Sequence, residues 1–171
     1  IRANRVTIKE YLDLFRTDER ELLSEAFEDP WRYFGSKSSV LATLKLTFNA
    51  IAAASPQAKE LLSLMAFLDG DSIPKELLRN ESDRAINTTR ALGTLLSFSV
   101  IVPVPHKSSY QMHRIVQISV WDWLEENRQR LAYEEKALFL LNERFPSGEY
   151  ETWKCCSVLL PHLEALLRYR D

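Results

Sequence analysis

A short motif in the second half of the chain, Met112-His113-Arg114, has the residue types best suited to chemistry. Tyr110 and Met112 alternate as in a strand, and apolar residues at helical spacing begin at Ile115. This pattern predicts that a strand delivers His113 to the N-terminus of a buried helix. Unpaired backbone N–H groups and the positive end of the helix dipole meet at such a terminus, which suits an anion such as phosphate.

A structural role for His113 stays open from the residues alone, because a lone histidine beside an apolar helix is usually a satisfied structural residue. Met112 is predicted to be a packing residue. Arg114 offers only hydrogen-bond donors, so it could pair with a carboxylate, pair with a phosphate, or be solvated. The solvated alternative is the default for an arginine in this position.

The sequence offers no other pattern of a catalytic or metal-binding site. We find no catalytic triad, no carboxylate dyad and no metal-ligand spacing. None of the four glycines stands in the phosphate-binding pattern G-x-x-x-x-G-K-[ST]. The chain is therefore expected to be neither an enzyme nor a metal protein on its own.

The remaining histidines and the tryptophans of the second half favour structural roles. His106 lies in a predicted turn and is expected to be exposed, whereas His162 is expected to be a surface or packing residue. Trp121, Trp123 and Trp153 stand among aliphatic residues at helical spacing. This spacing indicates core packing or helix docking.

Composition bounds the class of protein. The chain has 171 residues, of which 46% are hydrophobic and 27% charged, as expected for one to one-and-a-half soluble globular domains. A net charge of −2, with scattered lysines and arginines, fits a nucleic-acid binder poorly. No apolar run approaches the roughly 20 residues that cross a bilayer. No signal peptide is visible, and Ile1 in place of methionine suggests a start within a longer protein.

Cysteine usage indicates the compartment. Cys155 and Cys156 are adjacent and form neither a disulfide framework nor a metal framework. A reducing, cytoplasmic location is therefore the default expectation.

Helices are predicted for the first half of the chain. One helix begins near Thr7, and its apolar face continues, after an interruption, as far as Phe27. Residues 34–39 are predicted to be a linker. A second helix begins near Ser39. A third begins at Ser55-Pro56, with the serine as N-cap and the proline at the first helical position. It is expected to stop at Asp69-Gly70, where the glycine can adopt a left-handed conformation.

A helix–turn–helix with a wing is predicted next. Ile73-Pro74 is expected to begin a short helical turn, and a fourth helix offers an apolar face that includes Ile86 and Thr89. Residues 99–104 and 110–112 then form a predicted β-hairpin. Because prolines at 103 and 105 cannot donate to a ladder, this wing should be short and at a sheet edge. The fold class is therefore mainly α, with a winged helix-turn-helix.

Beyond Asn127 the pattern is helical again, with a stop and turn at Pro146-Ser147-Gly148. Two antiparallel helices joined by a short turn resemble the first unit of a helical repeat array, which the family resemblance given below identifies as of the tetratricopeptide (TPR) type. One unit cannot bury its own face, so further repeats are expected after Asp171. We therefore predict a helical subdomain tail over 1–36, a winged-helix domain over 37–127 and the start of a TPR-like region over 128–171.

These residues carry a family resemblance. Met112-His113-Arg114 followed by Ile115-Val116-Gln117 resembles the Met-His-Asp motif in the winged-helix subdomain of NB-ARC-type STAND ATPases. In particular, the chain resembles fungal NOD-like receptors that continue into TPRs, in which arginine at the third position is familiar. The segment Ile73-Pro74-x-x-Leu77-Leu78 is similar to the same family, and the resemblance covers almost the whole chain.

The resemblance implies a role for His113 that its spacing does not give. In NB-ARC proteins the matching histidine reaches the β-phosphate of bound ADP and holds the module closed. Met112 and Arg114 would be its motif neighbours. Because arginine has no hydrogen-bond acceptor, Arg114 cannot make the bonds that the aspartate of the Met-His-Asp motif accepts. ADP and ATP are thus the expected cofactors of a full-length parent, a slow ATPase switch. No cofactor is expected for this chain alone.

The resemblance also implies partners. They are a nucleotide-binding domain upstream, TPRs downstream and further copies of the parent in an oligomer formed on activation, with neither nucleic acid nor membrane among them. The implied setting is signal transduction, as in innate immunity or fungal heterokaryon incompatibility.

Two alternative functions stay open. A DNA-binding winged helix would need basic residues on its recognition helix and wing. The sequence supplies Arg84 and Arg90 in the helix, and His106 and Lys107 in the wing, which is few for strong binding. A plain scaffold whose helix pair recruits another protein is the other alternative, and the sequence does not separate it from the receptor module.

Overall fold

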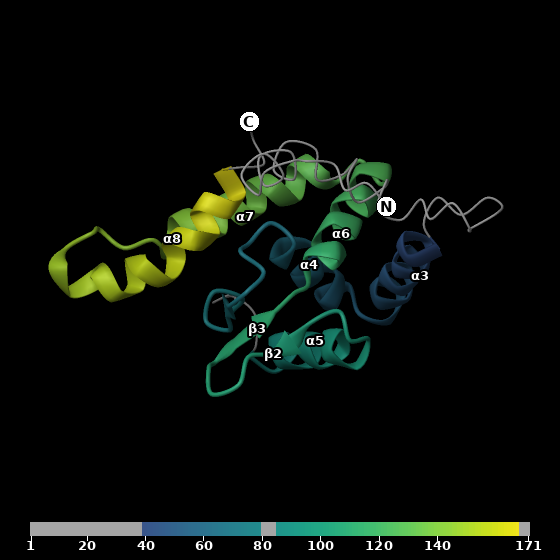
Figure 1. Cartoon of the computed structure of the whole chain (residues 1–171), viewed down its shortest axis with the longest axis horizontal. Helices are drawn as coiled ribbons and strands as arrows, with labels where there is room; N and C mark the ends of the chain where they lie inside the picture. The colour runs from purple at the N-terminus through teal and green to yellow at the C-terminus, as the bar shows by residue number, and fades with distance from the viewer. Residues whose placement is uncertain (1–38, 80–84, 168–171) are drawn as a thin grey trace, which may run out of the picture. The chain divides into compact units, whose positions relative to one another are not determined.

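Helices dominate the part of the chain that the computed structural model describes, residues 39–79 and 85–167 (Figure 1). The prediction of a mainly α fold is therefore confirmed for this part. The chain divides into two compact units, and the second, Leu44–Asp171, contains all the packing described below. The predicted helix from Thr7 to Phe27, the linker that follows it and the subdomain tail over 1–36 lie outside the described residues.

The first two described helices begin as their sequences predict. Helix α3 spans Ser39–Ala54 and helix α4 spans Pro56–Met65. Ser55 is the N-cap of α4, and its hydroxyl accepts a hydrogen bond from the Ala58 amide at 3.1 Å. Because proline has no N–H to leave unpaired at the first helical position, Ser55 and Pro56 together fix the start of α4.

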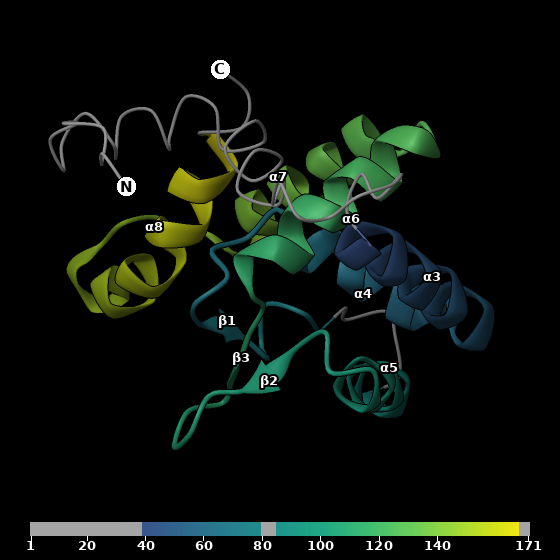
Figure 2. The same cartoon turned by 45° about the vertical axis from the view of Figure 1, so that its right-hand side comes forward.

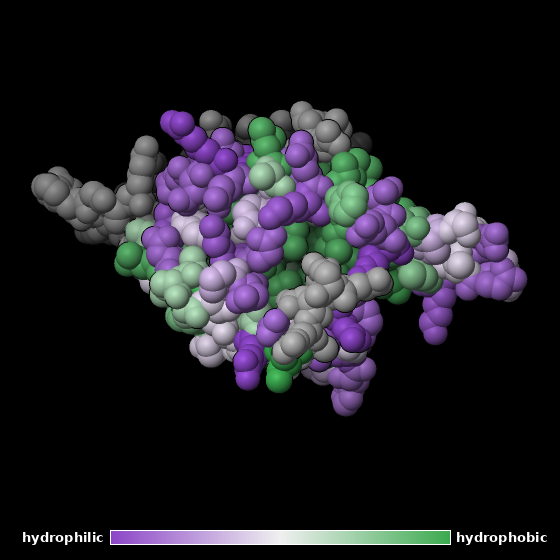
Figure 3. All heavy atoms as spheres, turned by 180° about the vertical axis from the view of Figure 1, so that it is seen from behind, coloured by the Kyte–Doolittle hydropathy of each residue, from purple (hydrophilic) through white to green (hydrophobic). Residues whose placement is uncertain are grey.

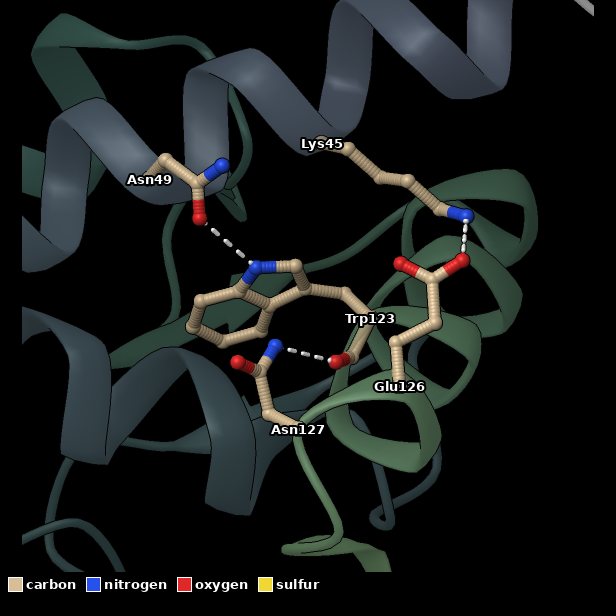
Figure 4. A network of polar contacts seen from close by, with 5 residues as sticks. All are labelled: Lys45, Asn49, Trp123, Glu126 and Asn127. Atoms are coloured by element: carbon tan, nitrogen blue, oxygen red, sulfur yellow. Dashed lines mark hydrogen bonds and ion pairs between the residues drawn. The ribbon is translucent and has the colours of Figure 1, made fainter.

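Helix α6 spans Arg114–Glu126, and α3 is tied to its C-terminal end. Figure 4 shows the Trp123 indole pointing toward α3, where its Nε1 donates to Asn49 Oδ1 at 2.9 Å. Lys45 forms an ion pair with Glu126 beside it, and the Phe48 and Trp123 rings lie 5.8 Å apart. Most of the α6 surface is buried, as the sequence predicts.

A small sheet packs near the start of α6. It consists of β1 (Ile73–Pro74), β2 (Val102–Pro103) and β3 (Ser109–Gln111) in the order β1-β3-β2, with both pairings antiparallel. Figure 2 shows the three strands together, with β3 leading directly into α6. The predicted hairpin is therefore present, and proline-containing β2 lies at an edge.

The sheet also corrects the prediction for Ile73-Pro74. This pair forms a strand whose Ile73 lies opposite Tyr110. The predicted helical turn bearing Leu77 and Leu78 is nevertheless present, and it begins at Pro74, whose carbonyl accepts the Leu77 amide at 3.1 Å. A two-residue strand carries no periodicity of its own, so only its pairing with β3 defines it.

Helix α5 spans Ala85–Ser97 and packs mainly on α4. Its buried face consists of Thr88, Ala91, Leu92 and Leu95. The sequence analysis placed Ile86 on this face, but Ile86 is 55% exposed. Thr89 is exposed as well, whereas the predicted Leu92 and Leu95 are buried, so the prediction for this face is wrong at Ile86 and Thr89.

The last two helices form a packed pair. Helix α7 spans Arg130–Arg144, and helix α8 spans Trp153–Leu167 after the short 3-10 helix η1, Tyr150–Thr152. Helix α7 is anchored on α4 by the Tyr133 hydroxyl, which donates to Glu60 at 2.8 Å, and by a Lys136–Glu60 ion pair at 2.7 Å. Burial and the neighbouring Glu60 carboxylate raise the pKa of Tyr133 to about 12.

Exposed apolar side chains stand on this helix pair. Leu131 and Phe139 of α7 are 74% and 61% exposed, and Trp153 of α8 is 60% exposed. Of the two roles predicted for Trp153, core packing is therefore wrong and helix docking stays a prediction, whereas Trp121 and Trp123 are buried. On the face opposite to that of Figure 1, hydrophobic side chains are interspersed with hydrophilic ones (Figure 3). Within the described residues, no helix is both long enough and apolar enough to cross a membrane.

Candidate functional site

His113 is the N-cap of α6 and is exposed to solvent, at the point where β3 delivers the chain to the helix. Its backbone is extended, with φ −64° and ψ 142°, and its Nδ1 accepts a hydrogen bond from the Ile115 amide at 3.2 Å. The prediction that a strand places this histidine at a helix N-terminus is therefore confirmed. The expectation of unpaired N–H groups is corrected at Ile115, whose amide is taken by the imidazole.

The capping bond fixes which ring nitrogen of His113 can bind a ligand. Because Nδ1 accepts the Ile115 amide proton, the proton of a neutral imidazole resides on Nε2. Nε2–H then points away from the cap as a hydrogen-bond donor. A donor at the positive end of a helix dipole is suited to an anionic oxygen.

Met112 anchors the backbone immediately before His113. Its side chain is buried, as predicted, with 2% exposed, and its amide donates to the Gly70 carbonyl at 2.8 Å. A Cβ placed on Gly70 would lie 2.6 Å from the Met112 carbonyl oxygen. The predicted left-handed cap at Gly70 is wrong, because the only glycine with positive φ among the described residues is Gly148. Glycine is required at position 70 because the Met112 carbonyl oxygen leaves no space for a side chain.

Two side chains of α6 hold the same loop, residues 66–72, which connects α4 to β1. Gln117 Nε2 donates to the Leu68 carbonyl at 2.8 Å, and Trp121 Nε1 donates to the Ala66 carbonyl at 3.0 Å. Both side chains are buried, so these bonds satisfy backbone groups that water cannot reach. The sequence analysis assigned no role to Gln117, although a glutamine within a helix that is apolar all round requires a partner.

Arg114 lies against the helix that it begins. Its guanidinium is 4.7 Å from the centre of the Trp121 ring and the residue is half-buried. A planar guanidinium stacks well on an indole face, with a contact worth about 0.5–2 kcal/mol. The default expectation of a solvated arginine is therefore corrected. Arg114 covers Trp121, and His113 beside it stays exposed.

His162 of α8 binds the opposite side of the 66–72 loop. Its Nδ1 accepts the Asp69 amide at 3.1 Å, and the residue is 2% exposed. Burial lowers the pKa of His162 below its usual value, and this effect exceeds the opposing effects of the Asp69 charge and a hydrogen bond to the Ser72 backbone. Of the two roles expected for His162, packing is confirmed and a surface position is wrong.

The buried His162 is expected to make the chain less stable in mild acid. Its folded pKa lies below 6.5 and its unfolded pKa lies near 6.5, so between these values only the unfolded chain binds the proton. Stability should therefore fall as the pH drops below about 6.5. Urea unfolding at about pH 7.5 and at about pH 5.5 measures the loss. His162→Asn keeps an acceptor without titrating, and an equally large loss in this variant would contradict the assignment.

A hollow with a volume of about 660 Å³ lies between α4, α5 and α7. None of the three motif residues lines it. Glu60 and Lys136 on its rim are already paired with each other. Within the described ranges, no group of three or more His, Cys, Asp or Glu side chains could hold a metal. The surroundings of His113 therefore stand as the candidate site.

Comparison with known proteins gives two matches. Residues 49–129 match a family model described as a domain of unknown function (DUF7779). Over its whole length the chain is 28% identical to a "nucleotide-binding leucine-rich repeat (NLR)-like protein" of Hyaloscypha variabilis, across 177 aligned positions. The chain spans 18% of that protein. No solved structure matches. The similarity suggests a relation to NLR-like proteins.

Proposed function

We propose that this chain is a regulatory winged-helix module of an NB-ARC or STAND signalling ATPase, and that His113 contacts the phosphate of ADP in a neighbouring nucleotide-binding domain. The observation that carries the proposal is an exposed histidine that caps a 13-residue helix and keeps Nε2–H for a ligand. The whole-length similarity to an NLR-like protein supports the same class.

The arrangement of elements supports the winged-helix assignment. Two helices, α4 and α5, flank strand β1 and precede the β2–β3 hairpin, and β1 pairs with β3 to complete a three-stranded sheet. This order matches a winged helix-turn-helix in which the hairpin is the wing. The wing passes into α6, so its position sets where His113 stands.

The proposed module works as a latch in a cytoplasmic, full-length receptor. A hydrogen bond from His113 to a charged phosphate contributes about 1.5–3 kcal/mol, enough to bias a two-state equilibrium by one to two orders of magnitude. Exchange of ADP for ATP releases this contact, and the freed module permits oligomer assembly. The parent is a slow ATPase, whereas this chain contributes positioning rather than catalysis.

We further propose that α7 and α8 begin a TPR array. Their exposed apolar side chains, including Leu131 and Phe139, support this assignment because a single helix pair leaves one face open. The surface of α5 favours a module of this kind over DNA binding. Arg90 is exposed there, but so is Ile86, and few phosphate contacts are available.

Removing the imidazole is expected to weaken ADP retention by the full-length protein about ten- to a hundredfold. His113→Ala loses both the cap and the phosphate donor. His113→Asn should keep the cap through its carbonyl oxygen, since asparagine is a good N-cap, but its shorter amide does not place a donor at the Nε2 position. ADP release from purified protein measures both variants.

His106→Ala is the matched control, because His106 is also an exposed histidine but lies in the wing turn. It should retain ADP as the unaltered protein does. Wild-type ADP release in both His113 variants would refute the phosphate contact. Normal retention in His113→Asn alone would reduce His113 to a helix cap.

A further inference from the structure

The loop of residues 66–72 is held from two sides by side chains distant in sequence. On one side, the Ala66, Leu68 and Gly70 carbonyls accept hydrogen bonds from Trp121, Gln117 and Met112. On the other side, the Asp69 amide donates to His162 of α8. The loop is therefore bonded on one side to α6 and the residue before His113, through three carbonyls, and on the other to α8, through the Asp69 amide.

This arrangement makes a short path between the buried His162 and His113, the N-cap of α6. His162 binds the amide of Asp69, and Gly70 is the next residue. Gly70 in turn accepts the Met112 amide at 2.8 Å, and His113 is the next residue after Met112. Two hydrogen bonds and two peptide units thus connect α8 to the residue that caps α6.

The path is stiff because the residues at its two ends are buried and the half-buried Gly70 is tightly packed against Met112. His162 and Met112 are each 2% exposed, and Gly70 leaves no space for a side chain against Met112. Buried hydrogen bonds are stronger than exposed ones, and their loss leaves unpaired backbone groups. A displacement of α8 is therefore transmitted to Met112 rather than absorbed by loose side chains.

We propose that His162 is a positioning residue that couples α8 to the backbone presenting His113. Movement of the helix pair pulls the Asp69 amide, shifts Gly70 against Met112 and alters the orientation of the α6 cap. The coupling is a property of this chain. Its significance for nucleotide retention rests on the function proposed above, in which a repeat region would report to the nucleotide through this path.

Amide hydrogen exchange resolved by NMR tests the coupling in the 171-residue chain without any nucleotide. The amides compared are those of Met112, at the end of the path, Ile115, capped by His113, and Leu62, in the core of α4 as an internal reference. His162→Leu removes the acceptor of the Asp69 amide and the hydrogen bond to the Ser72 backbone, and keeps an apolar side chain. It should raise the Met112 and Ile115 rates about five- to tenfold relative to Leu62.

Two variants separate coupling from general loosening. His162→Asn keeps an acceptor near the Nδ1 position and should restore the wild-type ratios. Leu166→Ala removes a fully buried side chain from the same helix but keeps the His162 imidazole, and should leave the ratios unchanged. Should His162→Leu not fold, His162→Ala supplies the same comparison with a smaller side chain.

Wild-type ratios in the acceptor-free variant would overturn the proposal, as would failure of His162→Asn to restore them. Equally large increases of the Met112 and Ile115 rates relative to Leu62 in Leu166→Ala would also overturn it. They would show that loosening α8 raises these rates even when the His162 hydrogen bond is kept. A negative result leaves the phosphate contact of His113 untouched. Conversely, normal ADP retention in the His113 variants would leave this coupling intact.

Discussion

Replacing Trp121 with alanine is expected to lower the free energy of unfolding by about 3–5 kcal/mol, as for other large-to-small changes in well-packed cores. The indole is 4% exposed, lies 6.2 Å from the Phe67 ring and supports the Arg114 guanidinium on one face. Its Nε1 also satisfies the Ala66 carbonyl. Trp121→Ala therefore leaves a cavity and also removes the hydrogen-bond donor of the Ala66 carbonyl in the 66–72 loop. Urea unfolding measures the loss.

Trp153→Ala is the matched control, because the same side chain is deleted from an exposed position. Trp153 is 60% exposed and packs edge-on against Tyr150, so its loss should cost less than about 1 kcal/mol. Trp121→Phe should fall between the two, since it fills part of the cavity but cannot donate to Ala66. A loss in Trp121→Ala no larger than that in Trp153→Ala would show that α6 does not depend on this packing.

Features that depend on adjacent residues could be predicted from the sequence. Ser55-Pro56 specifies a helix start by local chemistry, and the structure places the cap there. The run from Tyr110 to Ile115 changes from strand alternation to helical spacing, and the chain changes conformation at His113 as predicted. The role of His113 toward a phosphate stays a prediction, because the described residues do not test it.

Features that depend on distant residues could not be predicted in the same way. Gly70 was interpreted through its own backbone freedom, whereas the Met112 carbonyl is what excludes a side chain there. His162 does carry a signal. It lies between Leu159 and Leu166 on the buried face of α8, where a polar residue needs a partner. The sequence indicates that need but does not show that the partner is the Asp69 amide.

Gly70→Ala is expected to destabilise the chain by about 2–4 kcal/mol, the sum of overpacking and of a weakened backbone hydrogen bond. The new Cβ would stand 2.6 Å from the Met112 carbonyl oxygen, and a backbone atom cannot rotate away as a flexible side chain can. Relief requires the loop and the residue before His113 to separate. The Met112 amide should then exchange faster, and in the full-length protein ADP release should accelerate as in His113→Ala.

Gly93→Ala is the control for this substitution, because it makes the same chemical change at a glycine that has open space. Gly93 lies within α5, and a Cβ there would meet nothing within 4 Å. Alanine is favoured over glycine inside a helix by about 0.5–1 kcal/mol, so this variant should be slightly stabilised. Opposite signs in the two variants would locate the cost in the contact with Met112. If Gly70→Ala were as stable as Gly93→Ala, the start of α6 could move without disturbing the loop, and the path from α8 to His113 would not be rigid enough to couple them.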